Sequence, residues 1–216
     1  MNLKAKTLAA AAAMALAVVA MPASAIVYNF DATAVGAFGA PTYGTIELTQ
    51  DGTAVDFTVN LRADLNFVTT GNTNSKAVFS FNATGVSAGD IGSFGNPSGQ
   101  TFSVVQPGNN SPYGTFSFGI ICATGCSNGG SGGGYADPLT FTVADSVIAD
   151  FAIKSSGGAY FAADVIQLNG GATGAIGSTT VMTPVPEPET YALMLGRSRR
   201  HGLRRPPPPQ GRCLII

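Results

Sequence analysis

The fold class follows from one stretch of the chain, Val55-Asp56-Phe57-Thr58-Val59-Asn60-Leu61-Arg62. Every odd position in it is apolar and every even position is polar. Because successive side chains of a strand point to opposite faces, this alternation puts one face on a core and the other in water. A helix would scatter the same apolar residues around its axis. We therefore predict a half-buried β-strand here.

Two more segments alternate in the same way, and turn signals separate them from their neighbours. Apolar and polar side chains alternate over residues 77–82 and again over residues 139–143. Shorter or two-sided apolar strands are expected at residues 27–35, 43–48, 101–105, 113–121, 147–153 and 160–168. Turn-forming Gly, Asn, Asp and Pro residues stand between them at 50–52, 71–72, 96–97 and 108–110.

Many short strands at near-regular spacing, with no amphipathic helix between them, are typical of all-β domains. We predict an antiparallel β-sandwich of jelly-roll type over residues 26–183, preceded by a signal helix and followed by a disordered C-terminal tail. A closed barrel is the alternative, and the strand pattern does not separate the two.

The first 25 residues have the three parts of a secretory leader. Lys4 and Lys6 form a basic start, residues 8–21 are uncharged and apolar, and Ala23-Ser24-Ala25 offers the small residues that signal peptidase requires. A bilayer span needs about 20 apolar residues, so the apolar stretch is short for an anchor. We expect cleavage after Ala25, through the Sec translocon and signal peptidase, with an uncleaved N-terminal anchor as the alternative.

Charge is distributed unevenly along the chain. Residues 26–183 carry three cations and ten acids, a net charge of −7, whereas residues 197–212 are rich in arginine. An acidic domain repels phosphate backbones, so nucleic acid is not expected as its partner.

Two cysteines lie four residues apart after an apolar strand. Cys122 and Cys126 enclose Ala-Thr-Gly and precede the glycine-rich residues 128–134. In an oxidising compartment this spacing predicts a small-loop disulfide. A metal site would need two further ligands, and a redox pair usually has two residues between its cysteines. We predict no metal and no cofactor.

The predicted domain has no recognisable catalytic constellation. The one histidine, His201, lies in the basic tail, so no Ser-His-Asp relay is available within residues 26–183. The acids are scattered singly, and Asp56 and Asp150 are expected at solvated outward positions of strands. The glycine-rich stretch lacks the ending of a phosphate-binding loop. An enzyme is therefore not expected.

A motif near the C-terminus carries more information. Val185-Pro186-Glu187-Pro188-Glu189 follows a Thr/Gly-rich linker, and its two prolines favour an extended, accessible segment. With Thr190 to Leu195, these residues resemble the sorting signal of PEP-CTERM proteins of Gram-negative bacteria. The resemblance implies recognition by the membrane protease exosortase. It also implies export to the periplasm, cell surface or extracellular matrix, often alongside exopolysaccharide production.

The chain departs from that family after Leu195, where an apolar membrane helix should follow. Residues 196–212 are rich in arginine and proline, and Pro206 to Pro209 exclude a helix there. Residues 184–195 are thus a partial sorting motif without an anchor. One explanation is a basic, disordered surface tail; the one that we favour is a reading-frame slip. GC-rich codons read one base later would give a short apolar run, four arginines in place of the prolines, and a stop.

Two functions remain open for the predicted domain. We favour a non-enzymatic protein of the envelope or extracellular matrix. The alternative is a carbohydrate-binding module for exopolysaccharide, because jelly-roll sandwiches often present sugar-binding faces. Trp is absent, so the rings that would stack on sugars are those of Tyr43, Tyr113, Tyr135 and Tyr160.

Overall fold

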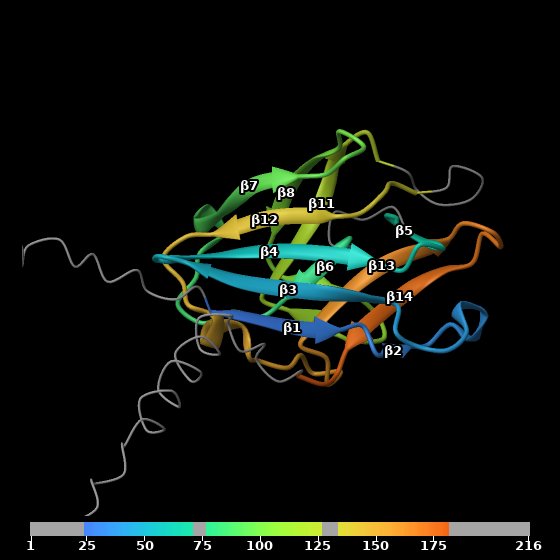
Figure 1. Cartoon of the computed structure of the whole chain (residues 1–216), viewed down its shortest axis with the longest axis horizontal. Helices are drawn as coiled ribbons and strands as arrows, with labels where there is room; N and C mark the ends of the chain where they lie inside the picture. The colour runs from blue at the N-terminus through green and yellow to red at the C-terminus, as the bar shows by residue number, and fades with distance from the viewer. Residues whose placement is uncertain (1–23, 71–76, 127–133, 182–216) are drawn as a thin grey trace, which may run out of the picture.

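The alternating segments fold as two antiparallel sheets packed face to face (Figure 1). The computed structural model describes residues 24–70, 77–126 and 134–181. The leader up to residue 23, the sorting motif and the basic tail lie outside these ranges. Within them the all-β prediction is confirmed.

The five-stranded sheet contains the strictly alternating stretch that begins at Val55. Val55, Phe57, Val59 and Leu61 are buried on one face of β4, and the residues between them are half-buried on the other. The strand order is β1-β3-β4-β12-β7. The strands are β1 (Ala25–Asn29), β3 (Gly44–Asp51), β4 (Ala54–Leu61), β12 (Leu139–Val143) and β7 (Ile91–Gly95).

The seven-stranded sheet has the order β2-β14-β13-β6-β11-β8, with β5 also paired to β13. Its strands are β2 (Ala32–Thr33), β5 (Leu65–Phe67), β6 (Phe79–Phe81), β8 (Thr101–Val105), β11 (Phe118–Thr124), β13 (Phe161–Gln167) and β14 (Thr173–Ser178). Strands that follow one another in sequence often lie in different sheets, as in jelly-roll sandwiches. Among the described residues the named strands form two separate large sheets, which is the arrangement of a sandwich rather than of a closed barrel.

Phenylalanine rings from both sheets fill the space between them. Phe57 of β4 stacks on Phe141 of β12 with 4.5 Å between ring centroids. Across the interface the Phe57 centroid lies 5.5 Å from that of Phe81 on β6 and 6.2 Å from that of Phe161 on β13. The ring of Phe151, from the loop after β12, meets Phe57 edge-on at 4.9 Å. Phe57 is therefore at the centre of an aromatic core.

A further segment, residues 106–117, covers part of the outer face of the seven-stranded sheet; we call it the strap. It contains the short pair β9 (Gly108–Asn109) and β10 (Thr115–Phe116). Because side chains alternate along β13, Ala162 points away from the main core, and it packs with strap residues in a second apolar cluster. The buried Asn110 amide donates to Ser80 Oγ at 2.8 Å. The members of this cluster are Tyr113, Phe116, Ala159, Ala162 and Ala175.

One predicted strand is wrong. Residues 147–153 form no strand but contain η6 (Ile148–Phe151), a 3-10 helix, and Asp150 lies in it rather than at an outward strand position. The Asp150 carboxylate accepts the Val147 N–H at 2.9 Å, which favours a helical turn over an extended chain. Phe151 still reaches the core. The segment is apolar, as predicted, but its backbone is helical where the prediction required an extended strand.

Other boundaries also differ from the prediction. The segment expected at 27–35 is interrupted after Asn29, the strand expected from residue 113 begins at Thr115, and Gly108–Asn109 pairs as β9 instead of forming a turn. Two further 3-10 turns, η3 (Gly36–Phe38) and η4 (Ala88–Asp90), connect strands. Strands β5, β7 and β14 were not predicted.

Candidate functional site

The outer face of the five-stranded sheet is the candidate site, because it is a large polar face that the described part of the fold leaves open. The outward residues of β13 in the other sheet are buried, for example Ala162 and Ile166. The outward residues of β3, β4 and β12 are half-buried or exposed. In Figure 1 the strands β1, β3, β4, β12 and β7 lie side by side in front, with the other sheet behind them. We call this surface the open face.

Three polar rows cross the open face at right angles to the strands. The central row joins Glu47 of β3 to Thr58 of β4 and Thr140 of β12. A second row joins Thr49, Asp56 and Thr142, and a third joins Thr45 to Asn60. Neighbouring strands lie about 4.8 Å apart and alternate residues of a strand about 6.8 Å apart. Hydroxyl, amide and carboxylate groups therefore recur at short, regular intervals.

Two carboxylates give the open face its charge. Glu47 is exposed, and it lies diagonally from Asp56, because its partner Thr58 is two residues beyond Asp56 on β4. The Thr142 hydroxyl donates to Asp56 Oδ1 at 2.7 Å and so fixes that carboxylate. No Lys or Arg belongs to the rows of the open face in the part of the chain that the structure describes. The face presents negative charge and many hydrogen-bonding groups.

A second surface feature is a shallow depression of about 360 Å³ at the end of the sandwich where the β3–β4 turn lies. The Gln50 side chain connects the segments around this depression. Its Nε2 donates to the carbonyl oxygens of Ala54 at 2.9 Å and Ser146 at 3.0 Å, and its Oε1 accepts the Ile148 N–H at 3.1 Å. The lining residues are Gly52, Thr53, Asp145, Ser146, Val147 and Asp150. Across the described ranges no group of three or more His, Cys, Asp or Glu residues could hold a metal ion. We assign no chemistry to this depression.

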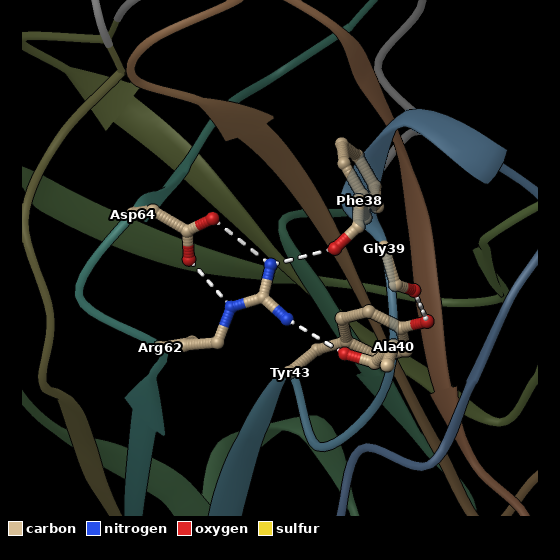
Figure 2. A network of polar contacts seen from close by, with 6 residues as sticks. All are labelled: Phe38, Gly39, Ala40, Tyr43, Arg62 and Asp64. Atoms are coloured by element: carbon tan, nitrogen blue, oxygen red, sulfur yellow. Dashed lines mark hydrogen bonds and ion pairs between the residues drawn. The ribbon is translucent and has the colours of Figure 1, made fainter.

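The opposite end of the sandwich carries a polar network around Arg62 (Figure 2). The guanidinium donates two hydrogen bonds to Asp64, from Nε at 2.5 Å and from Nη2 at 2.9 Å. It also donates to the carbonyls of Ala40 at 2.9 Å and Phe38 at 2.7 Å, and it lies over the Tyr43 ring. These bonds consume most of its donors. Arg62 therefore fastens the loop around η3 to the end of β4 and has little capacity left for an anionic ligand.

The Arg62 network predicts a stability effect that depends on pH. Arg62→Lys keeps the charge but loses the planar fork, and we expect it to lower the free energy of unfolding by about 1–2 kcal/mol for a partly exposed group. The hydrogen bond from Arg62 holds the pKa of Asp64 below its usual value. Because the folded pKa is depressed, this stabilisation is present above the unfolded value and is lost as pH falls through the folded one. Urea unfolding at neutral and acidic pH measures both effects. A difference between the two proteins that does not shrink in acid would contradict this account.

A buried acid lies in the seven-stranded sheet. Asp164 of β13 is 5% exposed, and its Oδ2 accepts the Thr70 N–H at 2.7 Å and the Thr70 hydroxyl at 2.5 Å. These bonds close the segment after β5 against β13. Asp164 has a structural role here, since burial keeps it away from any ligand in solution.

Three of the four tyrosines considered for sugar stacking are buried. Tyr43, Tyr113 and Tyr135 are 3%, 7% and 3% exposed, and the rings of Tyr43 and Tyr135 contact those of Phe38 and Phe67. Burial raises the pKa of both Tyr113 and Tyr135. Tyr160 is half-buried, with the Lys154 ammonium 4.9 Å from its ring centroid. The expected aromatic platform does not form, because these rings fill the core and the strap cluster.

The other predicted site residues fall in two groups. Cys122 and Cys126 form the predicted disulfide at the end of β11. Ala25 begins β1 and pairs with Thr49 of β3. Ala23 and the sorting residues Val185, Pro186, Glu187, Pro188 and Glu189 lie outside the described residues.

The disulfide closes a loop of known size, so its contribution to stability follows. Replacing both Cys122 and Cys126 with serine is expected to lower the free energy of unfolding by about 2 kcal/mol, the loop-closure entropy of about five residues. The comparison belongs in a Cys213→Ser background, so that the third cysteine cannot exchange. Chemical denaturation with and without reductant measures the effect. Reductant should destabilise the disulfide protein and leave the serine variant unchanged, and equal stability of the two in oxidant would contradict the prediction.

Comparisons with known proteins return no match: no family model, no curated protein and no solved structure is similar to this chain. In the described ranges no helix is long and apolar enough to cross a membrane.

Proposed function

We propose that this chain is an exported, non-catalytic protein of the cell envelope or extracellular matrix, with a leader that is cleaved and a sorting segment at residues 185–189. The observation that supports it best is the position of β1 relative to the expected cleavage site. Strand β1 begins at Ala25, the residue after which cleavage is expected, and Ile26 of the same strand pairs with Leu48 of β3. Cleavage there would leave nearly all of β1 in the mature domain.

The C-terminal end of the fold also fits this proposal. Asp31 accepts the Thr179 N–H at 2.7 Å and the Thr179 hydroxyl at 3.0 Å, and Thr180 donates to its other oxygen. Val181 then pairs antiparallel with Tyr28 of β1. The chain is thus fastened firmly to the sandwich a few residues before the sorting segment. Such an arrangement suits a domain that is attached to the cell envelope through its C-terminal end.

Mass spectrometry of the product from a Gram-negative host that encodes exosortase tests export. The mature protein should begin at Ile26, contain an oxidised Cys122–Cys126 pair and leave the cytosol. Ala23→Arg places a large charge where signal peptidase takes a small residue, so this variant should keep its leader. A wild-type product that retains residues 1–25 in the cytosol would contradict export.

The sorting step needs a separate comparison in the same host. A double change of Glu187→Gln and Pro188→Ala alters the motif without touching the described fold, and it should change how the product divides between envelope and medium only when exosortase is present. Thr183→Ala is the matched change outside the motif and should have no effect. The same division for all three chains would rule out a role for this segment in the chain as it stands.

Carbohydrate binding is the second candidate function, and one observation favours it. The open face carries hydroxyl, amide and carboxylate groups in rows, the groups that hydrogen-bond to sugar hydroxyls. Its support comes from this face and not from the buried tyrosines.

A further inference from the structure

The open face carries hydrogen-bonding groups in regular rows. Its rows offer threonine hydroxyls at Thr45, Thr49, Thr58, Thr140 and Thr142. A polymer of repeating sugar units can make several weak, equivalent hydrogen bonds to such a surface at once, and these add up through multivalency. With Tyr43, Tyr113 and Tyr135 buried, ring stacking adds little. Hydrogen bonds and charge must supply the affinity.

Charge then determines which polymer fits. Glu47 and Asp56 lie on adjacent strands of the open face, with Asp56 fixed by Thr142. The described residues contain ten acids but only two cations, Arg62 and Lys154. Arg62 is bound to Asp64, and Lys154 lies over Tyr160, so neither neutralises the open face. Such a surface repels anionic polymers and attracts cationic ones.

We propose that the open face binds a polysaccharide whose sugar units carry free ammonium groups. The ammonium groups would pair with Glu47 and Asp56, and the sugar hydroxyls would bond to the threonine rows. This inference rests on the second proposed function, carbohydrate binding, and is independent of export and sorting.

Affinity electrophoresis with two polymers of the same backbone tests it. Glycol chitosan carries free amines, and glycol chitin is its fully N-acetylated, neutral counterpart. At a pH where the amines are protonated, glycol chitosan should retard the full-length protein, and added salt should weaken the retardation because it screens exposed charges. Glycol chitin should bind at least about tenfold more weakly, the loss expected for removing charge-assisted hydrogen bonds. Any retardation by alginate, an anionic polymer, should come from the arginine-rich residues 197–212 and should stay the same when Glu47 and Asp56 are replaced.

The outcomes separate the inference from the function on which it rests. Equal retardation by glycol chitosan and glycol chitin would overturn the requirement for ammonium groups and leave carbohydrate binding standing. Absence of retardation by both polymers would overturn the two together.

Matched variants locate the binding surface. The double variant Glu47→Gln with Asp56→Asn removes both charges of the open face, while the amide oxygen that it places on β4 can still accept from Thr142. It should weaken binding to glycol chitosan by about tenfold or more. Asp145→Asn with Asp150→Asn makes the same change in net charge in the segment after β12, outside the rows of the open face, and it should weaken binding by less than about threefold. An equal loss in the two variants would show attraction to the whole acidic domain and overturn the assignment to this face.

A third variant tests the face without removing acids. Thr58→Lys puts a cation in the central row, at a half-buried outward position where a long side chain can extend into solvent. It should abolish retardation by glycol chitosan while its circular dichroism spectrum stays that of the wild type. Unchanged binding with an unchanged spectrum would contradict the proposal.

Discussion

Phe57→Ala is expected to lower the free energy of unfolding by about 3–5 kcal/mol, the usual cost of removing a fully buried phenylalanine ring. The ring lies between the two sheets and touches partners from both, with Phe141 at 4.5 Å, Phe151 at 4.9 Å and Phe81 at 5.5 Å between centroids. These neighbours are themselves large, rigid rings, so they cannot collapse readily into the space. Against a total stability of roughly 5–15 kcal/mol, the variant should be close to unfolding.

Urea unfolding, followed by near-ultraviolet circular dichroism, measures this loss. Phe57→Leu keeps most of the apolar volume and should lose clearly less. Thr58→Ala changes the next residue, on the open face, and should cost less than about 1 kcal/mol. A Phe57→Ala variant as stable as Thr58→Ala would mean that the aromatic core does not hold the sheets together.

Gly108→Ala is expected to detach the strap from the seven-stranded sheet. A Cβ atom at this position would lie 2.5 Å from the Phe118 carbonyl oxygen, 2.6 Å from the Gly119 nitrogen and 2.7 Å from Gly119 Cα. All three are backbone atoms of β11, so no side chain can turn aside to make room. The loss should reach about 3 kcal/mol, the upper end of the usual range for overpacking.

Gly36→Ala is the matched control for Gly108→Ala. A Cβ at Gly36 meets nothing within 4 Å, and Gly36 needs no positive φ. This change should therefore be neutral or slightly stabilising, because it reduces the entropy of the unfolded chain. Thermal unfolding of the two variants gives the comparison, and equal losses would contradict the close backbone approach.

The strap also predicts an alkaline transition. Burial raises the pKa of Tyr113 to about 12, with a further contribution from the charge of Asp31. Because the folded pKa exceeds the unfolded value of about 10, this stabilisation is present below pH 10 and is lost as pH rises through the folded pKa. Tyrosinate absorbance, assigned with Tyr113→Phe, should show Tyr113 titrating at lower pH in Gly108→Ala than in the wild type. An unchanged titration would mean that the strap stays in place.

The fold class was predictable because the alternation of residues 55–62 is strict. Val55, Phe57, Val59 and Leu61 are all buried, as the period of two requires. Strand β14, with the sequence Thr-Gly-Ala-Ile-Gly-Ser, shows no such period, since both of its faces are covered. Sequence periodicity therefore reveals a strand such as β4 and cannot reveal β14.

The candidate site was less predictable than the fold. Asp56 was correctly expected at an outward strand position, and the Cys122–Cys126 bond was correctly expected from spacing. The grouping of Asp56 with Thr142 joins residues 86 positions apart, and only the pairing of β4 with β12 brings them together. The tyrosines considered for sugar binding were buried by the same tertiary packing.

Local sequence alone was enough to establish the class of fold, the inward and outward residues of its alternating strands, and the pairing of two cysteines close enough to form a small loop. Side-chain direction in a strand and the size of a short loop depend on neighbouring residues alone. Packing between distant segments established which sheet the strap covers and which polar rows remain in solvent. Those outcomes depend on which segment of the chain packs against each face. The alternation of residues within a single strand does not identify that segment.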